Sequence, residues 1–237
     1  MPKRETNYLM TIHFSARPFA LVVFILFASQ LLSGCRTSSH SDDVQVRLIN
    51  ALPESGGLTV SVDGQRVWRN ARFRSSTGYQ GMAAGTYSVL VEADGLGTNP
   101  VISRPMSFEK GRRYTVVALG REGAAAARVQ VLEDEDSSAI PPGKAVLRLI
   151  QAAPDAGSVD LVVNNIVGVK SVRYGKRSEA LQLGRGSYDL KVVISDTPDA
   201  LASPIKLSLD AGHSYTLVTM GQGASGDLTL EAYADNP

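Results

Sequence analysis

The chain of 237 residues carries 24 Lys and Arg against 23 Asp and Glu, which leaves a net charge of +1, and it contains a single cysteine. A charge this close to zero argues against a dedicated nucleic-acid-binding protein. With one cysteine, the fold cannot depend on internal disulfides.

The first 34 residues have the three parts of a targeting segment. An apolar run covers residues 18–28 and is too short for a comfortable membrane span, which favours a signal peptide. An uncleaved anchor helix, or an ordinary signal peptide beside a chance cysteine, is the alternative. Either Met1 or Met10 can be the start of translation. The positive charges ahead of the apolar run are Lys3, Arg4 and Arg17.

The targeting segment ends in Leu32-Ser33-Gly34-Cys35, which resembles a bacterial lipobox. The resemblance implies that residues 1–34 are removed and that Cys35 becomes a lipid-carrying N-terminus. Two or more acyl chains anchor a protein stably, whereas one chain binds marginally. Lipidation also removes a lone thiol that would be a liability in an oxidising compartment. We therefore expect a membrane partner through lipid on Cys35 and a location in the cell envelope.

Arg36 follows the cysteine, where an Asp favours retention of Gram-negative lipoproteins in the inner membrane. The resemblance therefore implies the outer membrane if the cell is Gram-negative. Residues 35–43 are expected to form the lipidated cysteine and a polar tether, whose reach is at most about 25–30 Å. Removal of residues 1–34 takes away three positive and one negative side chain, so the net charge falls to −1.

The rest of the chain is a duplication with a constant offset of 101 residues. Of the 77 positions from Val44 to Gly120, 17 are identical in the second copy, without a gap. Separated matches in one register indicate a duplicated domain. We expect one repeat at 44–132 and the other at 145–237. The strongest matches are Arg47 to Pro53 with Arg148 to Pro154, and Tyr114 to Val117 with Tyr215 to Val218.

The segment 133–144 between the copies begins with the acidic run Glu133-Asp134-Glu135-Asp136. Its composition predicts a linker, which Pro141 and Pro142 should stiffen. Because the acidic run lacks the spacing of a calcium-binding loop, we expect its carboxylates to be solvated.

Apolar residues recur with a period of two inside each copy, which puts one face of a strand toward a core. Turn dipeptides such as Asp63-Gly64 separate short pieces of this kind. Six to eight strands in about 90 residues predict an all-β chain of two tandem β-sandwiches, immunoglobulin-like or transthyretin-like, with a small barrel as the alternative. The clearest alternations are Leu58-Val60-Val62, Tyr87-Val89-Val91, Val159-Leu161-Val163 and Tyr188-Leu190-Val192.

Four short motifs of the second copy are Ala152-Ala153-Pro154-Asp155, Tyr174-Gly175, Gly186-Ser187-Tyr188 and Gly212-His213-Ser214-Tyr215-Thr216. Together they resemble the bacterial envelope family called domain of unknown function 4397. The first copy departs from it, because Glu54 replaces the Asp and Phe73-Arg74 replaces Tyr-Gly. The resemblance implies a fold and no chemistry, since the family has no established activity.

The same motifs have structural explanations. Proline and an acidic residue at Pro53-Glu54 and Pro154-Asp155 suit a turn after a strand. Gly85 and Gly186 are predicted to adopt positive φ in a tight turn. Four tyrosines are predicted to bury their rings and to bond through the hydroxyl, as in a tyrosine corner. They are Tyr87, Tyr114, Tyr188 and Tyr215.

No catalytic constellation is visible. After residue 34 the histidines are His40 and His213, and neither has a neighbour suited to acid–base or nucleophilic work. No spacing suggests zinc, and Gly-x-Ser-x-Gly is absent. We expect no enzyme, no metal and no cofactor, although an enzyme whose site is assembled from distant residues would show a deep polar pocket.

Each copy has a basic segment that includes an aromatic residue. This could be a surface for an anionic glycan, lipid head groups or an acidic protein patch, with Trp68 as an anchor. The alternative is a charged strand edge that blocks unwanted pairing, with Trp68 in the core. The candidates are Arg66, Trp68, Arg69, Arg72 and Arg74, beside Phe73, and Lys170, Arg173, Tyr174, Lys176 and Arg177.

We therefore expect a structural or adhesive role through contact with an unknown envelope protein or polymer, and no nucleic-acid partner. A module that binds carbohydrate or polyanion through the basic segments is the alternative. Exposed aromatics in a groove would favour a glycan, whereas an unpaired edge strand would favour a protein partner.

Overall fold

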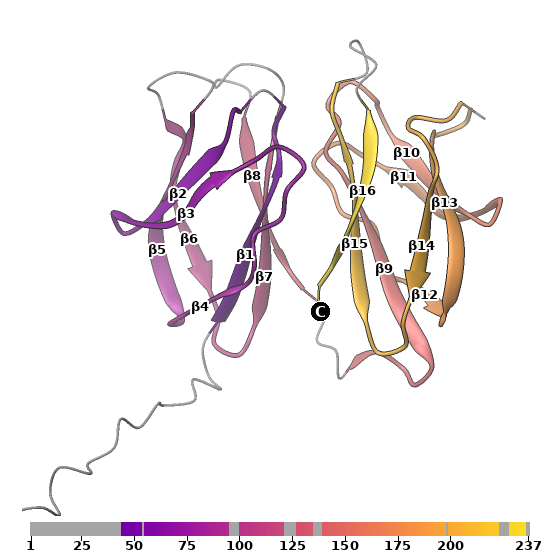
Figure 1. Ribbon diagram of the computed structural model, residues 1–237, viewed down its shortest axis with the longest axis horizontal. Coiled ribbons are helices and arrows are strands. Elements are labelled where there is room, and N and C mark those ends of the chain that lie inside the picture. The colour runs from indigo at the N-terminus through magenta and orange to yellow at the C-terminus, as the bar shows by residue number, and fades with distance from the viewer. Residues whose placement is uncertain are drawn as a thin grey trace, which may run out of the picture. The chain divides into compact units, whose positions relative to one another are not determined.

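The structure is a computed structural model that describes residues 44–53, 55–94, 100–120, 127–134, 139–197, 199–222 and 228–235. The described residues fall within one compact unit, Ser41–Pro237. They form 16 strands in four sheets of four strands, as Figure 1 shows. The predicted all-β fold with two β-sandwiches is confirmed. Among the described residues, no helix is long and apolar enough to cross a membrane.

The first sandwich consists of two sheets in the orders β4-β1-β7-β8 and β3-β2-β5-β6. Strands β1 and β7 run parallel, and every other neighbouring pair in these sheets is antiparallel. Its strands are β1 (Val44–Ala51), β2 (Leu58–Val62), β3 (Gln65–Ala71), β4 (Gln80–Met82), β5 (Gly85–Ala93), β6 (Pro100–Phe108), β7 (Arg113–Leu119) and β8 (Arg128–Glu133).

The second sandwich repeats this plan, with sheets in the orders β12-β9-β15-β16 and β11-β10-β13-β14. Strands β9 and β15 form the parallel pair. Because each repeat builds two separate open sheets, the small-barrel alternative is wrong. The strands are β9 (Lys144–Gln151), β10 (Val159–Val163), β11 (Ile166–Val172), β12 (Leu181–Gly184), β13 (Gly186–Ile194), β14 (Ile205–Leu209), β15 (Ser214–Met220) and β16 (Thr229–Ala234).

Each sandwich has its own apolar core between its sheets. Alternate residues of the predicted strands supply it, such as Val60 and Val91 in the first repeat and Leu161 and Val192 in the second. Full burial of one such side chain contributes roughly 1.5–3 kcal/mol. The period-two pattern in the sequence therefore locates these two cores correctly.

A third apolar cluster lies between the repeats. Strands β1, β7, β9 and β15 are buried on both faces, as strands in parallel pairs commonly are. Ile49 and Ile150 occupy equivalent positions in this cluster, as do Val117 and Val218. The two repeats thus use the same sheet face against each other. The buried members are Ile49, Ala51, Val117, Leu119, Leu132, Ile150, Ala152, Val218 and Met220.

The four tyrosines bond through their hydroxyls as predicted, but only Tyr114 and Tyr215 are buried, whereas Tyr87 and Tyr188 are half-buried. The Tyr87 hydroxyl donates to the carbonyl of Ala83 at 2.7 Å, and the Tyr188 hydroxyl donates to the carbonyl of Gly184 at 2.9 Å. The hydroxyls of Tyr114 and Tyr215 each accept a backbone N–H from five residues upstream, at 3.1 Å. Both repeats therefore carry the same two tyrosine anchors.

The prediction of positive φ at Gly85 and Gly186 is wrong. Both residues begin strands and are absent from the positive-φ positions of the described chain. A Cβ on Gly186 would lie 3.6 Å from the ring of Tyr188, so the residue sits beside the tyrosine without strain.

Positive φ falls instead where a turn requires it, at Gly111 (74°) and Gly212 (81°). It also occurs at Gly175 (70°), the glycine of the Tyr-Gly motif. Its equivalent in the first repeat, Arg74, adopts nearly the same φ of 65° despite its side chain. The backbone conformation at this position is thus the same in both repeats, although the first repeat lacks the Tyr-Gly motif.

Candidate functional site

The basic segment of the first repeat lies along β3, an edge strand of its sheet. Arg66 and Arg69 are exposed, whereas Trp68 is only 8% exposed and belongs to the apolar core. Trp68 therefore cannot act as a surface anchor, and that part of the prediction is wrong. Its partner across the sheet is Val60 of β2, which also faces the core.

The remaining arginines of this segment follow β3. Arg72 is exposed, and the Nε atom of Arg74 lies 3.8 Å from the carboxylate of Glu231. The Arg74 guanidinium also lies 5.6 Å from the ring centre of Phe73, which packs against the cluster between the repeats. The aromatic residue of this segment thus serves packing.

The edge strands of both repeats carry the features that protect an exposed edge. Asn70 on β3 and Ser171 on β11 have positive φ, and both strands slip in register against their neighbours. Bulges and positive charge discourage pairing with another strand. For Arg66 and Arg69 this edge-protection alternative is supported.

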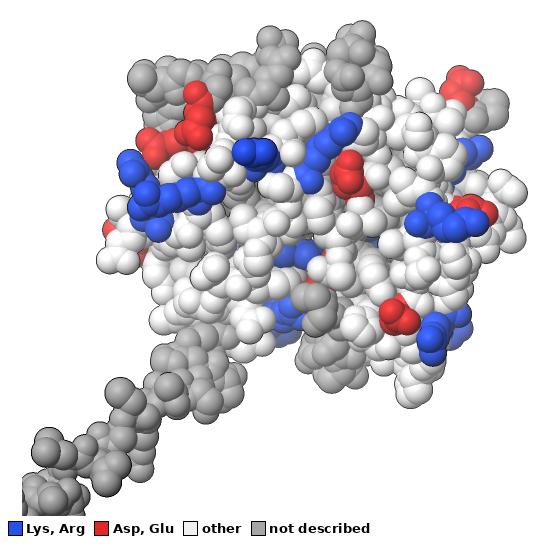
Figure 2. Space-filling model, in the orientation of Figure 1, with Lys and Arg blue, Asp and Glu red and all other residues white. Residues whose placement is uncertain are grey.

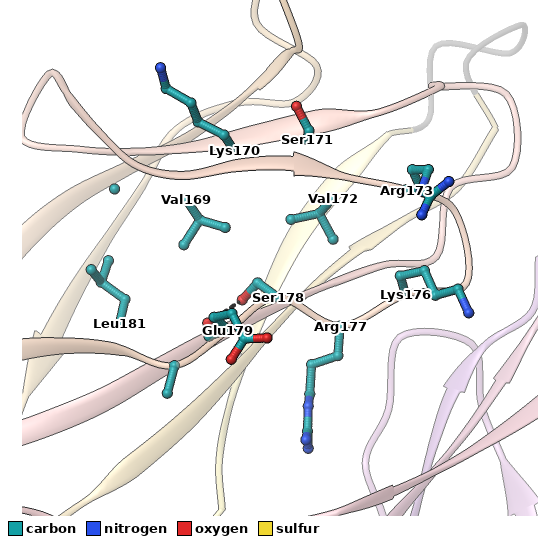
Figure 3. Close-up of a pocket in the computed structure, with 12 residues that line it drawn as sticks. Val169, Lys170, Ser171, Val172, Arg173, Lys176, Arg177, Ser178, Glu179 and Leu181 are labelled. Atoms are coloured by element: carbon teal, nitrogen blue, oxygen red, sulfur yellow. Dashed lines mark hydrogen bonds between the residues drawn. The ribbon is translucent and has the colours of Figure 1, made fainter.

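The basic segment of the second repeat surrounds an open groove of about 510 Å³. Figure 3 shows β11 and the segment before β12 on its two sides. Tyr174 does not line it, because its ring packs against the cluster between the repeats. The expected role of Tyr174 as the aromatic of this surface is therefore wrong. The polar lining residues are Lys170, Ser171, Arg173, Lys176, Arg177, Ser178 and Glu179.

The groove has an apolar floor and a charged rim. Val169, Val172 and Leu181 form the floor and pack on the core of the second sandwich. The side chains of Lys170 and Arg177 extend away from each other on opposite sides of it (Figure 3). No aromatic side chain is among the residues that line it.

Hydrogen bonds fix one wall of the groove. The Ser178 hydroxyl donates to the carbonyl of Glu179 at 2.7 Å and accepts the N–H of Leu149 at 3.0 Å. Arg177 donates to the carbonyl of Glu133 in the first repeat at 2.6 Å, so its guanidinium is held in place. Lys170, Arg173 and Lys176 are exposed.

The first repeat carries larger side chains at two of the positions equivalent to the groove lining. Trp68 stands where the second repeat has Val169, and Tyr79 stands where it has Ala180. Trp68 is buried in the apolar core of the first sandwich, whereas Val169 is half-buried and lines the groove. The second repeat thus has smaller side chains at two positions that line its groove.

A buried polar cluster between the repeats was not predicted. Arg47 donates through Nε to the Thr115 hydroxyl at 2.8 Å and forms an ion pair with Asp235 of the second repeat. Thr115 and Tyr79 both donate to the Asp134 carboxylate at 2.8 Å. Thr216, the equivalent of Thr115, donates to Asp235 at 2.8 Å. Thr115 and Asp134 are identical to Thr216 and Asp235 at the offset of 101 residues. Nothing in the sequence, however, indicates that the two sets of residues lie close together.

The cluster corrects one prediction about the linker. Asp134 is not a solvated carboxylate, because it is half-buried and accepts hydrogen bonds from Tyr79 and Thr115. Its burial, followed by the charge of Asp235, raises the pKa of Asp134. Burial also raises the pKa of Tyr79, and next in size is the effect of Asp134. Burial lowers the pKa of Arg148, and the nearby charge of Arg177 lowers it further.

Metal-ligating side chains do not gather in the part of the chain that the structure describes. No group of three or more His, Cys, Asp or Glu side chains among them could hold a metal ion. His213 lies beside Tyr215, with 6.4 Å between ring centroids. Figure 2 shows Lys and Arg in separate groups on the face drawn, interspersed with Asp and Glu. The lipobox Leu32-Ser33-Gly34, with Cys35, lies outside the described residues.

The family follows from two matches in sequence. The family described as Domain of unknown function (DUF4397) matches residues 44–162 and 145–237. The chain belongs to the DUF4397 family. The predicted resemblance, with two copies of the domain, is confirmed. No curated protein matches the chain.

Some solved structures are distantly similar to the chain. A family 26 carbohydrate-binding module of Eubacterium rectale Amy13K with maltoheptaose has a TM-score of 0.27 at 10% identity, over 82% of this chain and 98% of that one. A streptococcal virulence factor that binds α-glucan also gives 0.27, at 12% identity over 74% and 92%. A Bacteroides fragilis protein assigned to cell adhesion has a TM-score of 0.22 at 10% identity, over 81% of this chain and 97% of that one. Similarity this low says nothing about the ligand of a DUF4397 protein.

Proposed function

We propose that this DUF4397 protein is a lipid-anchored, non-catalytic envelope protein with a structural or adhesive role, and that it binds a protein partner. The observation that supports this role best is the groove of the second repeat. It runs beside the edge strand β11, its floor is apolar, and no aromatic side chain lines it. Sugar-binding grooves commonly stack rings on aromatic side chains, whereas peptides place apolar side chains into apolar pockets.

The anchor part of the proposal rests on the sequence. Cleavage before Cys35 and lipidation of its thiol would leave residues 36–43 as a tether to Val44, where β1 begins. The short tether would hold the first repeat within about 30 Å of the membrane surface. The groove lies in the second repeat, beyond the first one along the chain.

Contact between the repeats supports presentation of the groove on one body. The cluster of nine buried apolar residues joins equivalent faces of the two repeats. Arg47 and Asp235 pair across the same boundary, and Arg177 at the groove bonds to the carbonyl of Glu133. A load on the groove would therefore be transmitted to the anchored repeat through packed side chains.

The carbohydrate or polyanion alternative has one observation in its favour, which is the number of cations on the rim. Glu179 lies among the same lining residues and opposes a simple polyanion. A polyanion would also be expected to engage Arg66 and Arg69, which are exposed on β3. The two alternatives thus differ in whether the first repeat takes part.

The test is photo-crosslinking in intact cells. A photoreactive amino acid replaces Lys170 beside the groove or, as the matched control, Arg69 at the equivalent place in the first repeat. One protein crosslinked from position 170 and not from position 69 supports the proposal. Crosslinks to glycan alone, or equal crosslinks from both positions, contradict it.

A further inference from the structure

We propose that the groove of the second repeat binds an extended acidic peptide segment of the partner protein, with one small aliphatic side chain on the apolar floor. The inference rests on the proposed function and specifies the chemistry of the partner. It also assigns one such site to each chain, although the domain is present twice.

The floor selects a small aliphatic side chain. Val169 and Leu181 are half-buried, and Val172 is 5% exposed. These side chains are already packed on the core of the second sandwich, so they offer an ordered apolar surface. Further burial by a ligand methyl group removes apolar area from water at little entropic cost.

The rim selects carboxylates. Lys170, Arg173 and Lys176 are exposed around the groove, and one peptide can reach cations on more than one side of it. Complementary charge of this kind accelerates encounter and fixes register. Arg177 contributes positive charge from a fixed position, because it donates to the carbonyl of Glu133.

Glu179 distinguishes a peptide from a small anion. Its carboxylate is part of the groove lining, where it would repel a phosphate or sulfate ion that entered. It can accept an N–H from a peptide backbone, while the acidic side chains of that peptide stay at the rim. The groove therefore fits a ligand that is neutral at its centre and negative on its flanks.

The first repeat serves as an internal control. Its edge strand β3 carries Arg66 and Arg69, and Arg72 follows, so the positive charge is comparable. Trp68 stands in place of Val169, however, so the first repeat lacks one of the small aliphatic side chains of the floor. The first repeat therefore has comparable positive charge but a tryptophan at the position of Val169, so the effect of charge can be compared with the effect of the floor in one molecule.

The probe is an acetylated and amidated heptapeptide with one central valine and three glutamates on each side, labelled with a fluorophore. The full chain, purified in detergent, is titrated against it, and anisotropy is followed. We expect saturable binding of one peptide per chain. Exchange of the valine for serine should weaken binding, and exchange of the glutamates for lysine should abolish it. Inorganic phosphate should not compete.

Two variants separate the groove from general charge. Lys170→Ser with Arg173→Ser and Lys176→Ser should weaken binding by about tenfold or more, because three flanking charges are lost. The matched variant Arg66→Ser with Arg69→Ser and Arg72→Ser changes the charge equally and should alter affinity by less than about twofold. Val169→Trp copies the first repeat and should remove binding, with the thermal melt as a check on folding.

Several results would overturn the inference. They are no binding by the unaltered chain, equal losses in the two triple variants, and equal affinity for the serine and valine peptides. Failure here is distinguishable from failure of the proposed function. A single protein crosslinked from position 170 would keep the proposed function even if the peptide did not bind.

Discussion

Arg47 of the first repeat and Asp235 of the second form an ion pair with side chains that are 3% and 1% exposed. Burial of two charges is costly, and mutual pairing with further hydrogen bonds offsets the cost. Arg47 also donates to Thr115 and to the carbonyl of Ala234, and Asp235 accepts from Thr216. The pair therefore specifies how the C-terminal strand of the second repeat meets β1.

Arg47→Met should lower the free energy of unfolding by about 3–5 kcal/mol, because Asp235 is left buried without its cation. The measurement is urea unfolding of the full chain. Arg112→Met breaks the exposed ion pair with Glu133, whose atoms are 2.8 Å apart, and should cost less than about 1 kcal/mol. Addition of Asp235→Leu to Arg47→Met should restore part of the lost stability. A double variant no better than the single one would contradict this account of the pair.

The pH dependence of stability should carry the signature of Asp134. Its pKa is raised in the folded state, so the folded chain binds this proton more tightly than the unfolded chain. The contribution of Asp134 to stability is therefore least favourable above its folded pKa and improves as the pH falls through that value. Asp134→Asn imitates the protonated form at every pH.

The check is a comparison of unfolding free energies from about pH 7 down to about pH 4, a window that lies above the ordinary pKa of Asp. Relative to Asp134→Asn, the unaltered protein should gain stability as the pH falls. Asp199→Asn, at an exposed position, provides the control and should leave the profile unchanged. A constant difference between wild type and Asp134→Asn across the range would rule out the raised pKa.

The sequence predicted the parts of the fold that depend on local patterns. Alternation in β2 and β10 places Val60 and Leu161 in cores, and the constant offset predicts the same strand order in both repeats. The burial of Arg47 was not predicted, because a charged residue between apolar ones in a strand normally points to solvent. Its partner lies 188 residues away, and no local pattern can indicate that contact.

The candidate site was predicted only in part. The basic residues were found, but the bulge at Asn70 shifts the period so that Trp68 and Ala71, three residues apart, are both buried. Simple alternation does not show such a shift. The sequence does show one relevant difference, because Val169 of the second repeat aligns with the much larger Trp68 of the first repeat.

Tyr188 should stabilise the second repeat through two separate contributions, the hydrogen bond of its hydroxyl and the packing of its ring. Tyr188→Phe loses the bond to the carbonyl of Gly184 and should cost about 1 kcal/mol. Tyr188→Ala also removes the ring from the edge of the core and should cost about 3–5 kcal/mol. Thermal melts of the two variants test this. Equal losses would mean that the ring contributes nothing beyond its hydroxyl.

Two glycines that look alike in sequence should respond differently to alanine. Gly212 has a φ of 81°, so Gly212→Ala forces a strained backbone and should cost about 1 kcal/mol or more. Gly186 lacks positive φ, and an added Cβ would lie at 3.6 Å from the Tyr188 ring, an ordinary contact. Gly186→Ala should therefore leave the unfolding midpoint nearly unchanged. A larger loss at Gly186 than at Gly212 would reverse this assignment.

The anchor should depend on one atom, the sulfur of Cys35. Cys35→Ser preserves the size of the side chain but removes the thiol that receives lipid, so the protein should leave the membrane fraction after cell breakage. Each buried CH₂ of an acyl chain contributes about 0.8 kcal/mol, which makes loss of the lipid a large change in membrane affinity. Ser38→Ala, in the expected tether, is the control and should stay in the membrane fraction. Mass spectrometry of the N-terminal peptide would show the acyl groups directly, and an unmodified Cys35 in membrane-bound protein would exclude the lipid anchor.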